Sequence, residues 1–315
     1  MTLTELRYII ALARERHFGR AAQACHVSQP TLSVAVRKLE DELGVTLFER
    51  AANALTITPL GQRIITQAQR VVEETALIKH IAQQGGDPLS GPLHIGVIYT
   101  VGPYLLPHLI PLLHNSAPRM TLLIEEGYTA HLTERLRRGE VDVIVISLPF
   151  AEPGVVTQAV YDEPFKVVLP VQHPWKKEKS IKPRALAQEN LLLLGAGHCF
   201  RDQVLKACPA LNRASAVGSL QRTLEGGSLE TIRHMVASGA GITVLPCTSV
   251  HGHEAEDHLL LTRPFADPAP KRRIALAWRS SFPRPEAVET LRVAIHACPL
   301  RCVTMLDSPP RSVKS

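Results

Sequence analysis

The segment Gly195–Cys208, GAGHCFRDQVLKAC, holds two cysteines nine residues apart around a stretch that is predicted to be helical. A cysteine thiolate can be oxidised to a sulfenic acid, and a second thiol can condense with that acid to form a disulfide. On an ideal helix nine residues rise by about 13.5 Å, whereas a disulfide needs its Cα atoms within about 7 Å. Cys199 and Cys208 therefore cannot bond while the helix between them is intact, and a bond would have to unwind it.

Cys199 is expected at the start of that helix, after a loop from Gly195 to His198. Free amides and the positive end of the helix dipole favour a thiolate there, by about 0.3 to 1 kcal/mol. Arg201 and His198 could add to this effect, and Asp202 would oppose it. The spacing does not match zinc sites, which use Cys-x-x-Cys pairs or closely spaced histidines, so we expect neither a metal nor a cofactor.

The four other cysteines are interpreted as structural or bystander thiols. Cys25 adjoins an Ala-rich helical face and Cys247 follows an apolar strand, so both are expected to be buried and inert. Cys298 and Cys302 flank a proline near a chain end that is expected to be loose. Six cysteines scattered over 315 residues are unlike the framework of a small secreted domain, which favours thiols in a reducing compartment.

Composition places the chain among ordinary globular proteins, with 45% hydrophobic and 20% charged residues. Its length suggests two or three domains, and no apolar run approaches the roughly 18 residues of a membrane span, so we expect a cytoplasmic protein without membrane contact. The net charge of +6 hints at an acidic partner without proving nucleic-acid binding. The run HGHEAEDH, with His251 and His253, is interpreted as solvated surface.

The first 58 residues predict two helices, a turn, a third helix and a two-stranded wing. The third helix should run from Gln29 to Leu43, because Ser28 is a good N-cap and Gly44 suits the position just past a helix end. A short alternating run up to Thr58 predicts the wing, with a turn at Asn53.

The third helix has an apolar stripe and a polar face. A helix fits the major groove of DNA, and side chains near its N-terminus can reach base edges. Our candidates for base contacts are Gln29, Thr31, Ser33 and Arg37, and those for phosphates or the minor groove are Ser28, Lys38 and Arg50.

A long helix is predicted next, beginning at Thr58 and Pro59. Its apolar side chains step by four and three residues, and this seam suggests a partner helix: Ile64, Ala68, Val71, Thr75, Ile78 and Ala82. The Gly- and Pro-containing stretch QQGGDPLSGP then reads as a linker. We therefore expect a DNA-binding domain at 1–58, a dimerisation helix and linker at 59–90, a regulatory domain at 91–300 and a loose tail at 301–315.

From Leu93 onward, apolar strands alternate with helices, which predicts a parallel sheet with crossover helices. Thr100 and Thr129 fall just beyond the carboxyl ends of two predicted strands, where open sheets bind ligands. Two similar sets of elements suggest two lobes, the first at about 91–162 and 268–300 and the second at about 163–267.

Residues 21–63 closely resemble LysR-type transcriptional regulators, and the resemblance extends over nearly the whole chain, to about residue 297. Ser-Gln-Pro, Lys-Leu-Glu, Leu-Phe-Glu-Arg and Thr-Pro-Leu-Gly occur in that order. The resemblance implies an α/β protein: an N-terminal winged helix-turn-helix with a long dimerisation helix, then a two-lobed regulatory domain like periplasmic binding proteins. It also implies a homodimer through 59–82 that assembles into a tetramer, binds double-stranded promoter DNA and recruits RNA polymerase.

The segment Gly197-His198-Cys199, Arg201-Asp202-Gln203 and Cys208 resembles the redox segment of the OxyR peroxide sensors within that family. The resemblance implies that hydrogen peroxide oxidises Cys199, that Cys208 resolves the product to a disulfide, and that a cellular thiol reductant resets the switch. By the same resemblance the peroxide-binding residues are Thr100, Thr129, His198 and one arginine of the run Lys271-Arg272-Arg273, for which we favour Arg272 over Arg273.

Two other functions stay open. The chain could be a LysR-type regulator whose lobes clasp a small metabolite, with the cysteines incidental. It could also be a thiol peroxidase that turns over peroxide, with DNA binding secondary. We favour a regulator that is not an enzyme.

Overall fold

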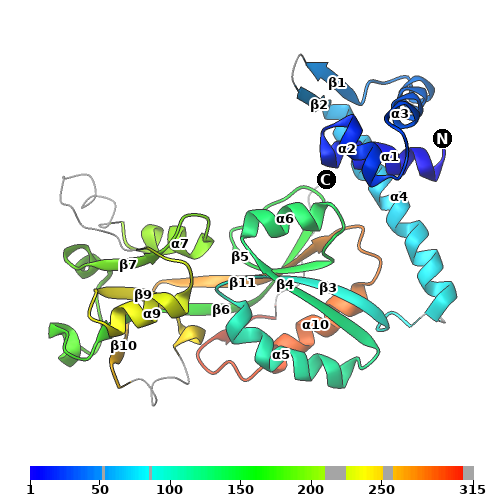
Figure 1. Ribbon diagram of the computed structural model, residues 1–315. Helices are drawn as coiled ribbons and strands as arrows, with labels where there is room; N and C mark the ends of the chain where they lie inside the picture. The colour runs from blue at the N-terminus through cyan, green and yellow to red at the C-terminus, as the bar shows by residue number, and fades with distance from the viewer. Residues whose placement is uncertain (52–53, 85–86, 210–224, 251–257, 308–315) are drawn as a thin grey trace. The chain divides into compact units, whose positions relative to one another are not determined.

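The computed structural model describes residues 1–51, 54–84, 87–209, 225–250 and 258–307 (Figure 1). The chain divides into two compact units, Met1–Pro88 with Ser281–Pro285, and Leu89–Ser280 with the residues from Glu286 onward. The predicted turn at Asn53 and the run that contains His251 and His253 lie outside the described residues.

The first unit is a helical bundle with a two-stranded wing. Its elements are α1 (Leu3–Glu15), α2 (Phe18–Ala24), α3 (Gln29–Leu43), β1 (Phe48–Ala51), β2 (Ala54–Ile57) and α4 (Pro59–Gln84). The two strands pair antiparallel, with Phe48 opposite Ile57. One apolar core joins the helices through fully buried side chains such as Ile9, Leu12 and Leu32, each of which contributes about 1.5–3 kcal/mol by leaving water.

The prediction for α3 is confirmed at both ends. Ser28 Oγ accepts a hydrogen bond from the Thr31 amide at 3.3 Å, which caps one of the free donors of the first turn. Gly44 ends the helix at a φ of 67°, a left-handed conformation that a side chain would strain.

The apolar side chains predicted along α4 fall into two groups, one buried in the core of the first unit and one exposed. Ala68 is buried in the core of its own unit, so its part of the seam is not free for a partner. Val71 and Ile78 are 37% and 66% exposed. Apolar side chains at that spacing on a solvent-facing helix are what a partner helix would cover.

The second unit is built on one sheet, in which ten strands of the described residues take part. Its strands are β3 (Gly91–Ile98), β4 (Met120–Gly127), β5 (Val143–Leu148), β6 (Val155–Pro170), β7 (Leu191–Leu194), β8 (Glu225–Gly226), β9 (Ile242–Pro246), β10 (Leu260–Pro264), β11 (Lys271–Arg279) and β12 (Thr304–Met305). The order is β4-β3-β5-β11-β6-β9-β7-β8, and β10 and β12 also pair with β6. Strands β3, β4 and β5 are parallel, as are β7, β8 and β9.

The prediction of a parallel sheet is wrong for its middle. β6 is antiparallel to β11, β9 and β10, and β11 is antiparallel to β5. The reason is that β6 runs the length of both lobes: Val155–Pro164 pair with β11, and Phe165–Val168 pair with β9. The predicted lobe boundary at residues 162–163 thus falls within one continuous strand.

Helices cover the sheet at both ends (Figure 1). They are α5 (Gly102–Ser116), α6 (Thr129–Arg137), α7 (Cys199–Ala207), α9 (Leu229–Ala237) and α10 (Pro285–Ala297), with short 3-10 turns at Pro174–Lys177, Pro183–Gln188 and Cys247–Ser249. The predicted return of β11 to the first lobe is confirmed, because β11 pairs with β5. Within the described residues, no helix combines the length and apolar composition that a membrane span requires.

The chain end corrects two expectations. Cys247 and Cys302, interpreted above as bystander thiols, form a disulfide with a Cα–Cα distance of 6.1 Å. The segment after Cys298 is not loose as far as residue 307, because Thr304 and Met305 pair with β6. Neither contact could be predicted locally, because the two cysteines are 55 residues apart and β12 pairs with the distant strand β6. Cys25, Cys199, Cys208 and Cys298 are free thiols.

Candidate functional site

Thr100 and Thr129 follow two neighbouring parallel strands, β3 and β4. Ile98 and Gly127 are register partners at the carboxyl ends of β3 and β4. Thr100 follows β3 by two residues, and Thr129 follows β4 by two residues and opens α6. Their predicted position beyond the strand ends is confirmed, at the sheet edge where parallel strands bind ligands.

The loop after β7 and the start of α7 supply the other side. Gly197 turns the chain at a φ of 96°, His198 is the N-cap residue, and Cys199 is the first residue of α7, as predicted. Its thiol therefore lies at the end of the helix where backbone amides have no intrahelical acceptor.

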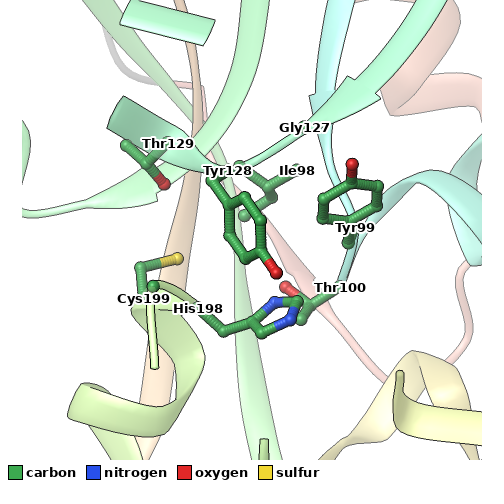
Figure 2. A pocket seen from close by; sticks show the side chains of 9 residues that line it. Ile98, Tyr99, Thr100, Gly127, Tyr128, Thr129, His198 and Cys199 are labelled. Atoms are coloured by element: carbon green, nitrogen blue, oxygen red, sulfur yellow. The ribbon is translucent and has the colours of Figure 1, made fainter. Parts of the chain in front are cut away.

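These elements enclose a small pocket (Figure 2). Its lining includes Thr100, Thr129, His198 and Cys199, together with Tyr99 and Tyr128 and the adjoining backbone residues Ile98, Gly127 and Gly197. The free space is about that of one water molecule. Thr129 Oγ1 is buried and has no hydrogen-bond partner among the described residues, so it is a polar atom that a bound molecule would satisfy.

Arg272 lies behind Thr100 rather than in the pocket lining. Its Nη1 donates to Thr100 Oγ1 at 2.7 Å, its Nη2 donates to the Thr100 carbonyl at 2.8 Å, and its Nε donates to Glu163 Oε2 at 2.7 Å. Because the Thr100 hydroxyl oxygen already accepts from the guanidinium, its own proton is free to be donated to a ligand. Arg273 points elsewhere and pairs with Asp162 at 2.6 and 2.9 Å.

The charges around Cys199 differ from expectation. Burial lowers the pKa of His198, and a backbone hydrogen bond with Gly227 only partly opposes this, so the imidazole is neutral near pH 7. Arg201 donates to Glu225 Oε1 at 2.6 Å and to the Leu194 carbonyl at 2.8 Å. Neither residue brings an uncompensated positive charge to Cys199, which leaves the helix terminus as the main electrostatic aid to a thiolate.

Cys208 lies at the opposite end and on a different face of α7. Phe200, Val204 and Cys208 repeat every four residues and are each at most 2% exposed, so they form the face that packs into the core of the second lobe. Burial raises the pKa of the Cys208 thiol to about 11, so it is protonated at neutral pH. The structure thus bears out the expectation that the helix separates the two thiols.

Gln203 makes a contact between α7 and β5 that sequence reasoning missed. Its Nε2 donates to Ser147 Oγ at 2.7 Å, which ties α7 to β5, while its Oε1 is buried without a described partner. The residue was part of the redox segment, but its partner is 56 positions away, so nothing local revealed the contact. Tyr99 and Tyr128 were missed too, although each directly precedes a predicted threonine.

The predicted DNA-contacting residues gather on α3 and its start. Ser28, Gln29, Thr31, Arg37 and Lys38 are exposed, and Ser33 is half-buried. Lys38 Nζ lies 3.2 Å from Glu5 Oε1, although its side chain remains 68% exposed. The side chain of Arg50 lies outside the described part of the structure.

Metal binding has no support within these residues. Among the described side chains, no group of three or more histidine, cysteine, aspartate or glutamate residues is arranged to hold a metal ion.

Comparison with known proteins gives consistent matches over nearly the whole chain. Residues 3–62 match the bacterial regulatory helix-turn-helix protein family of the lysR type, and residues 86–297 match the LysR substrate binding domain. The chain is 41% identical over 297 residues to the DNA-binding transcriptional dual regulator OxyR of Escherichia coli K12, with 94% of this chain and 95% of that protein covered.

Two solved structures are similar in fold as well as in sequence. A full-length OxyR variant from Pseudomonas aeruginosa matches with a TM-score of 0.73 and 54% identity, over 95% of this chain and 99% of that chain. A hydrogen-peroxide-bound OxyR mutant from Corynebacterium glutamicum matches with a TM-score of 0.62 and 33% identity, over 94% and 92%.

Proposed function

Because this chain belongs to the LysR family of transcriptional regulators and, within it, to the OxyR group, we propose that it senses hydrogen peroxide and regulates transcription through a reversible Cys199–Cys208 disulfide. One observation carries the proposal. Cys199 opens onto a pocket with room for about one water-sized molecule, while the second thiol is buried at the far end of the same helix.

The first chemical step is a two-electron oxidation of sulfur. The Cys199 thiolate attacks one peroxide oxygen, the O–O bond breaks, and hydroxide leaves and takes a proton to become water. We expect the hydroxyls of Thr100 and Thr129 to donate to the peroxide oxygens and to stabilise the leaving hydroxide. Arg272 holds Thr100 in the orientation that this requires. The neutral imidazole of His198 gives its N–H to the Gly227 backbone, so its other nitrogen can accept a peroxide proton.

The second step couples chemistry to shape. The Cys208 sulfur attacks the sulfenic sulfur, the S–O bond breaks, and the departing hydroxide takes the Cys208 proton to leave as water. For the Cys208 sulfur to reach Cys199, α7 must unwind. Phe200 and Val204 must then leave the core. The helix must also break the contact between Gln203 and Ser147.

Unwinding also makes the disulfide easy to reduce. Exposing Phe200 and Val204 costs about 1.5–3 kcal/mol each, or about 3–6 kcal/mol together. A cost of that size raises the reduction potential by about 60–130 mV, since about 30 mV corresponds to 1.4 kcal/mol for a two-electron couple. A cellular thiol reductant would then reset the switch.

The first unit would carry the signal to DNA. We assign DNA binding to residues 1–58, dimerisation to 59–90 through the exposed Val71 and Ile78, and sensing to 91–300. The oxidised second lobe would repack the subunits of a tetramer in the cytoplasm and so change how the protein holds promoter DNA and recruits RNA polymerase.

Peptide mass mapping tests the sensing proposal. The reduced protein is digested after alkylation, with and without prior exposure to about one equivalent of hydrogen peroxide. We expect a Cys199–Cys208 crosslink only after peroxide, whereas Cys25 stays alkylated in both samples. Free thiols at both Cys199 and Cys208 after peroxide exposure would exclude the switch.

Arg37→Ala tests the assignment of α3 to the major groove. Loss of a base contact should weaken binding to the specific site by about 5- to 150-fold, corresponding to about 1–3 kcal/mol, and lower the preference over random DNA. Lys38→Ala is the matched control, because loss of a phosphate contact should weaken both kinds of binding alike and reduce the salt dependence. Titrations of the specific site and of random DNA at several salt concentrations measure the two affinities and their salt dependence. Equal losses of specific and random binding for Arg37→Ala would disprove its role in base reading.

A metabolite-binding regulator is kept as a second candidate because of one observation. A wide groove lies beside the second half of α7, with Leu148, Lys206 and Arg273 in its lining, and it is larger than the pocket at Cys199. A regulator that used this groove would keep its response without Cys199. A thiol peroxidase would instead consume many equivalents of peroxide per cysteine pair with a thiol reductant.

A further inference from the structure

Two tyrosines form the solvent side of the pocket at Cys199. The rings of Tyr99 and Tyr128 meet edge to face, with centroids 5.3 Å apart and planes at 79°. Both also pack against the ring of His198, at 5.9 and 4.8 Å. In the view of Figure 2 the ring of Tyr128 stands between the thiol of Cys199 and the ring of Tyr99, with the His198 ring below it. We call Tyr99 and Tyr128 the tyrosine rim.

The backbone fixes the position of the tyrosine rim. Tyr99 and Tyr128 directly follow Ile98 and Gly127, which are partners in the register of β3 and β4, so the two rings leave adjacent strands side by side. Gly197 lies beside the Tyr128 ring, since a Cβ atom added to Gly197 would come within 3.4 Å of that ring. The loop that carries Cys199 is therefore packed directly on one of the two rings.

Exposure differs among the residues that line the pocket, with Cys199 and Thr129 half-buried and Gly197 exposed. Tyr99 and Tyr128 are 40% and 42% exposed, whereas His198 and Thr100 are 6% and 2% exposed. Large aromatic side chains usually lie with much of their surface buried, so two half-exposed rings at the mouth of a reactive site need an explanation. A reactant larger than the pocket must extend past its lining, which includes these two rings.

We propose that the tyrosine rim selects peroxides by size, admitting hydrogen peroxide to Cys199 and excluding alkyl hydroperoxides. This inference rests on the proposed function. When the Cys199 thiolate attacks the terminal oxygen of a hydroperoxide ROOH, the O–O bond breaks and RO⁻ leaves and takes a proton to become ROH. The leaving oxygen must lie beside the donors Thr100 and Thr129, so its R group must extend beyond them. In hydrogen peroxide R is a hydrogen atom, but in tert-butyl hydroperoxide it is a branched group that would overlap the tyrosine rings.

Rate constants for the two peroxides test this directly. Tyr99→Ala, Tyr128→Ala and the double variant are mixed with hydrogen peroxide or tert-butyl hydroperoxide, and loss of the Cys199 thiol is followed by quenched alkylation and mass analysis. We expect the ratio of the rate constant with tert-butyl hydroperoxide to that with hydrogen peroxide to rise by about 10-fold or more, the scale on which a pocket discriminates small apolar groups. Tyr99→Phe and Tyr128→Phe are the matched controls, which keep the rings and should keep the native preference.

The outcomes separate this inference from the function on which it rests. If the native protein reacts with hydrogen peroxide but the alanine variants keep its preference between the two peroxides, the tyrosine rim is not a filter. Equal losses with both peroxides in the alanine variants would also overturn it, since the rings would then only position His198. If the native Cys199 does not react with hydrogen peroxide at all, the proposed function fails and the filter fails with it.

Discussion

The Cys199→Ser variant is expected to lose its transcriptional response to hydrogen peroxide completely. Serine keeps the size and position of the side chain, but its oxygen cannot be oxidised to the counterpart of a sulfenic acid. No disulfide with Cys208 can then form, and α7 has no reason to unwind. In vitro transcription from a target promoter, with protein reduced or treated with peroxide, measures the effect.

Cys25→Ser is the matched control for this variant. Cys25 is a free, partly exposed thiol in the first unit, far in sequence from the redox segment, and its loss should leave the response intact. A Cys199→Ser protein that still responds to peroxide would contradict the account and would favour a regulator that uses another site, such as the groove beside Lys206 and Arg273.

Arg272→Ala is expected to cause the largest loss of stability. Arg272 and Glu163 have fully buried side chains, and the guanidinium also holds both oxygens of Thr100 and lies 5.1 Å from the centre of the Phe200 ring. Removing one partner of a buried ion pair leaves the other charge uncompensated and costs about 3–5 kcal/mol. For a domain of this size we expect Tm to fall by about 6–20 °C, measured by thermal denaturation of the reduced protein.

Arg273→Ala provides the comparison, because the same residue type is removed from the next position. Its side chain is 43% exposed, and its partner Asp162 keeps an ion pair with Lys271 at 2.7 Å. We expect Arg273→Ala to lower the free energy of unfolding by about 1 kcal/mol or less, as for other exposed ion pairs. Equal losses of stability in the two variants would show that the buried pair is not the support of Thr100 that we describe.

The choice between these two arginines illustrates what sequence could not decide. Successive residues of a strand point to opposite faces, so only one of Arg272 and Arg273 can approach Thr100. Which one does so depends on the pairing of β11 with β6, where Arg272 lies opposite Glu163 and Arg273 opposite Asp162. That register joins residues more than 100 positions apart, and no local pattern reports it.

Features with local causes were predictable. Ser28 and Gly44 delimit α3 through backbone hydrogen bonding and a left-handed φ, both of which depend on the residue itself. The start of α7 at Cys199 follows in the same way from the glycine-containing loop before it. Apolar runs ended before Thr100 and Thr129, which placed both at the ends of strands.

Features that depend on distant partners were not predictable. The disulfide between Cys247 and Cys302 joins the 3-10 turn after β9 to a chain end that was expected to be loose. Gln203 looked like one polar residue among several on α7 until Ser147 was seen beside it. The tyrosine rim likewise needed the alignment of two strands, because nothing in either tyrosine's own segment brings the rings together.

Hydrogen exchange of the α7 backbone amides tests most directly whether joining the two thiols rebuilds this helix. In the reduced protein, amides such as that of Cys208, which donates to the Val204 carbonyl at 3.0 Å, should be protected. After oxidation we expect peptides spanning residues 199–208 to lose that protection, while α9 in the same lobe keeps its own. A Cys199–Cys208 disulfide formed in full, with the protection of α7 unchanged, would contradict the account.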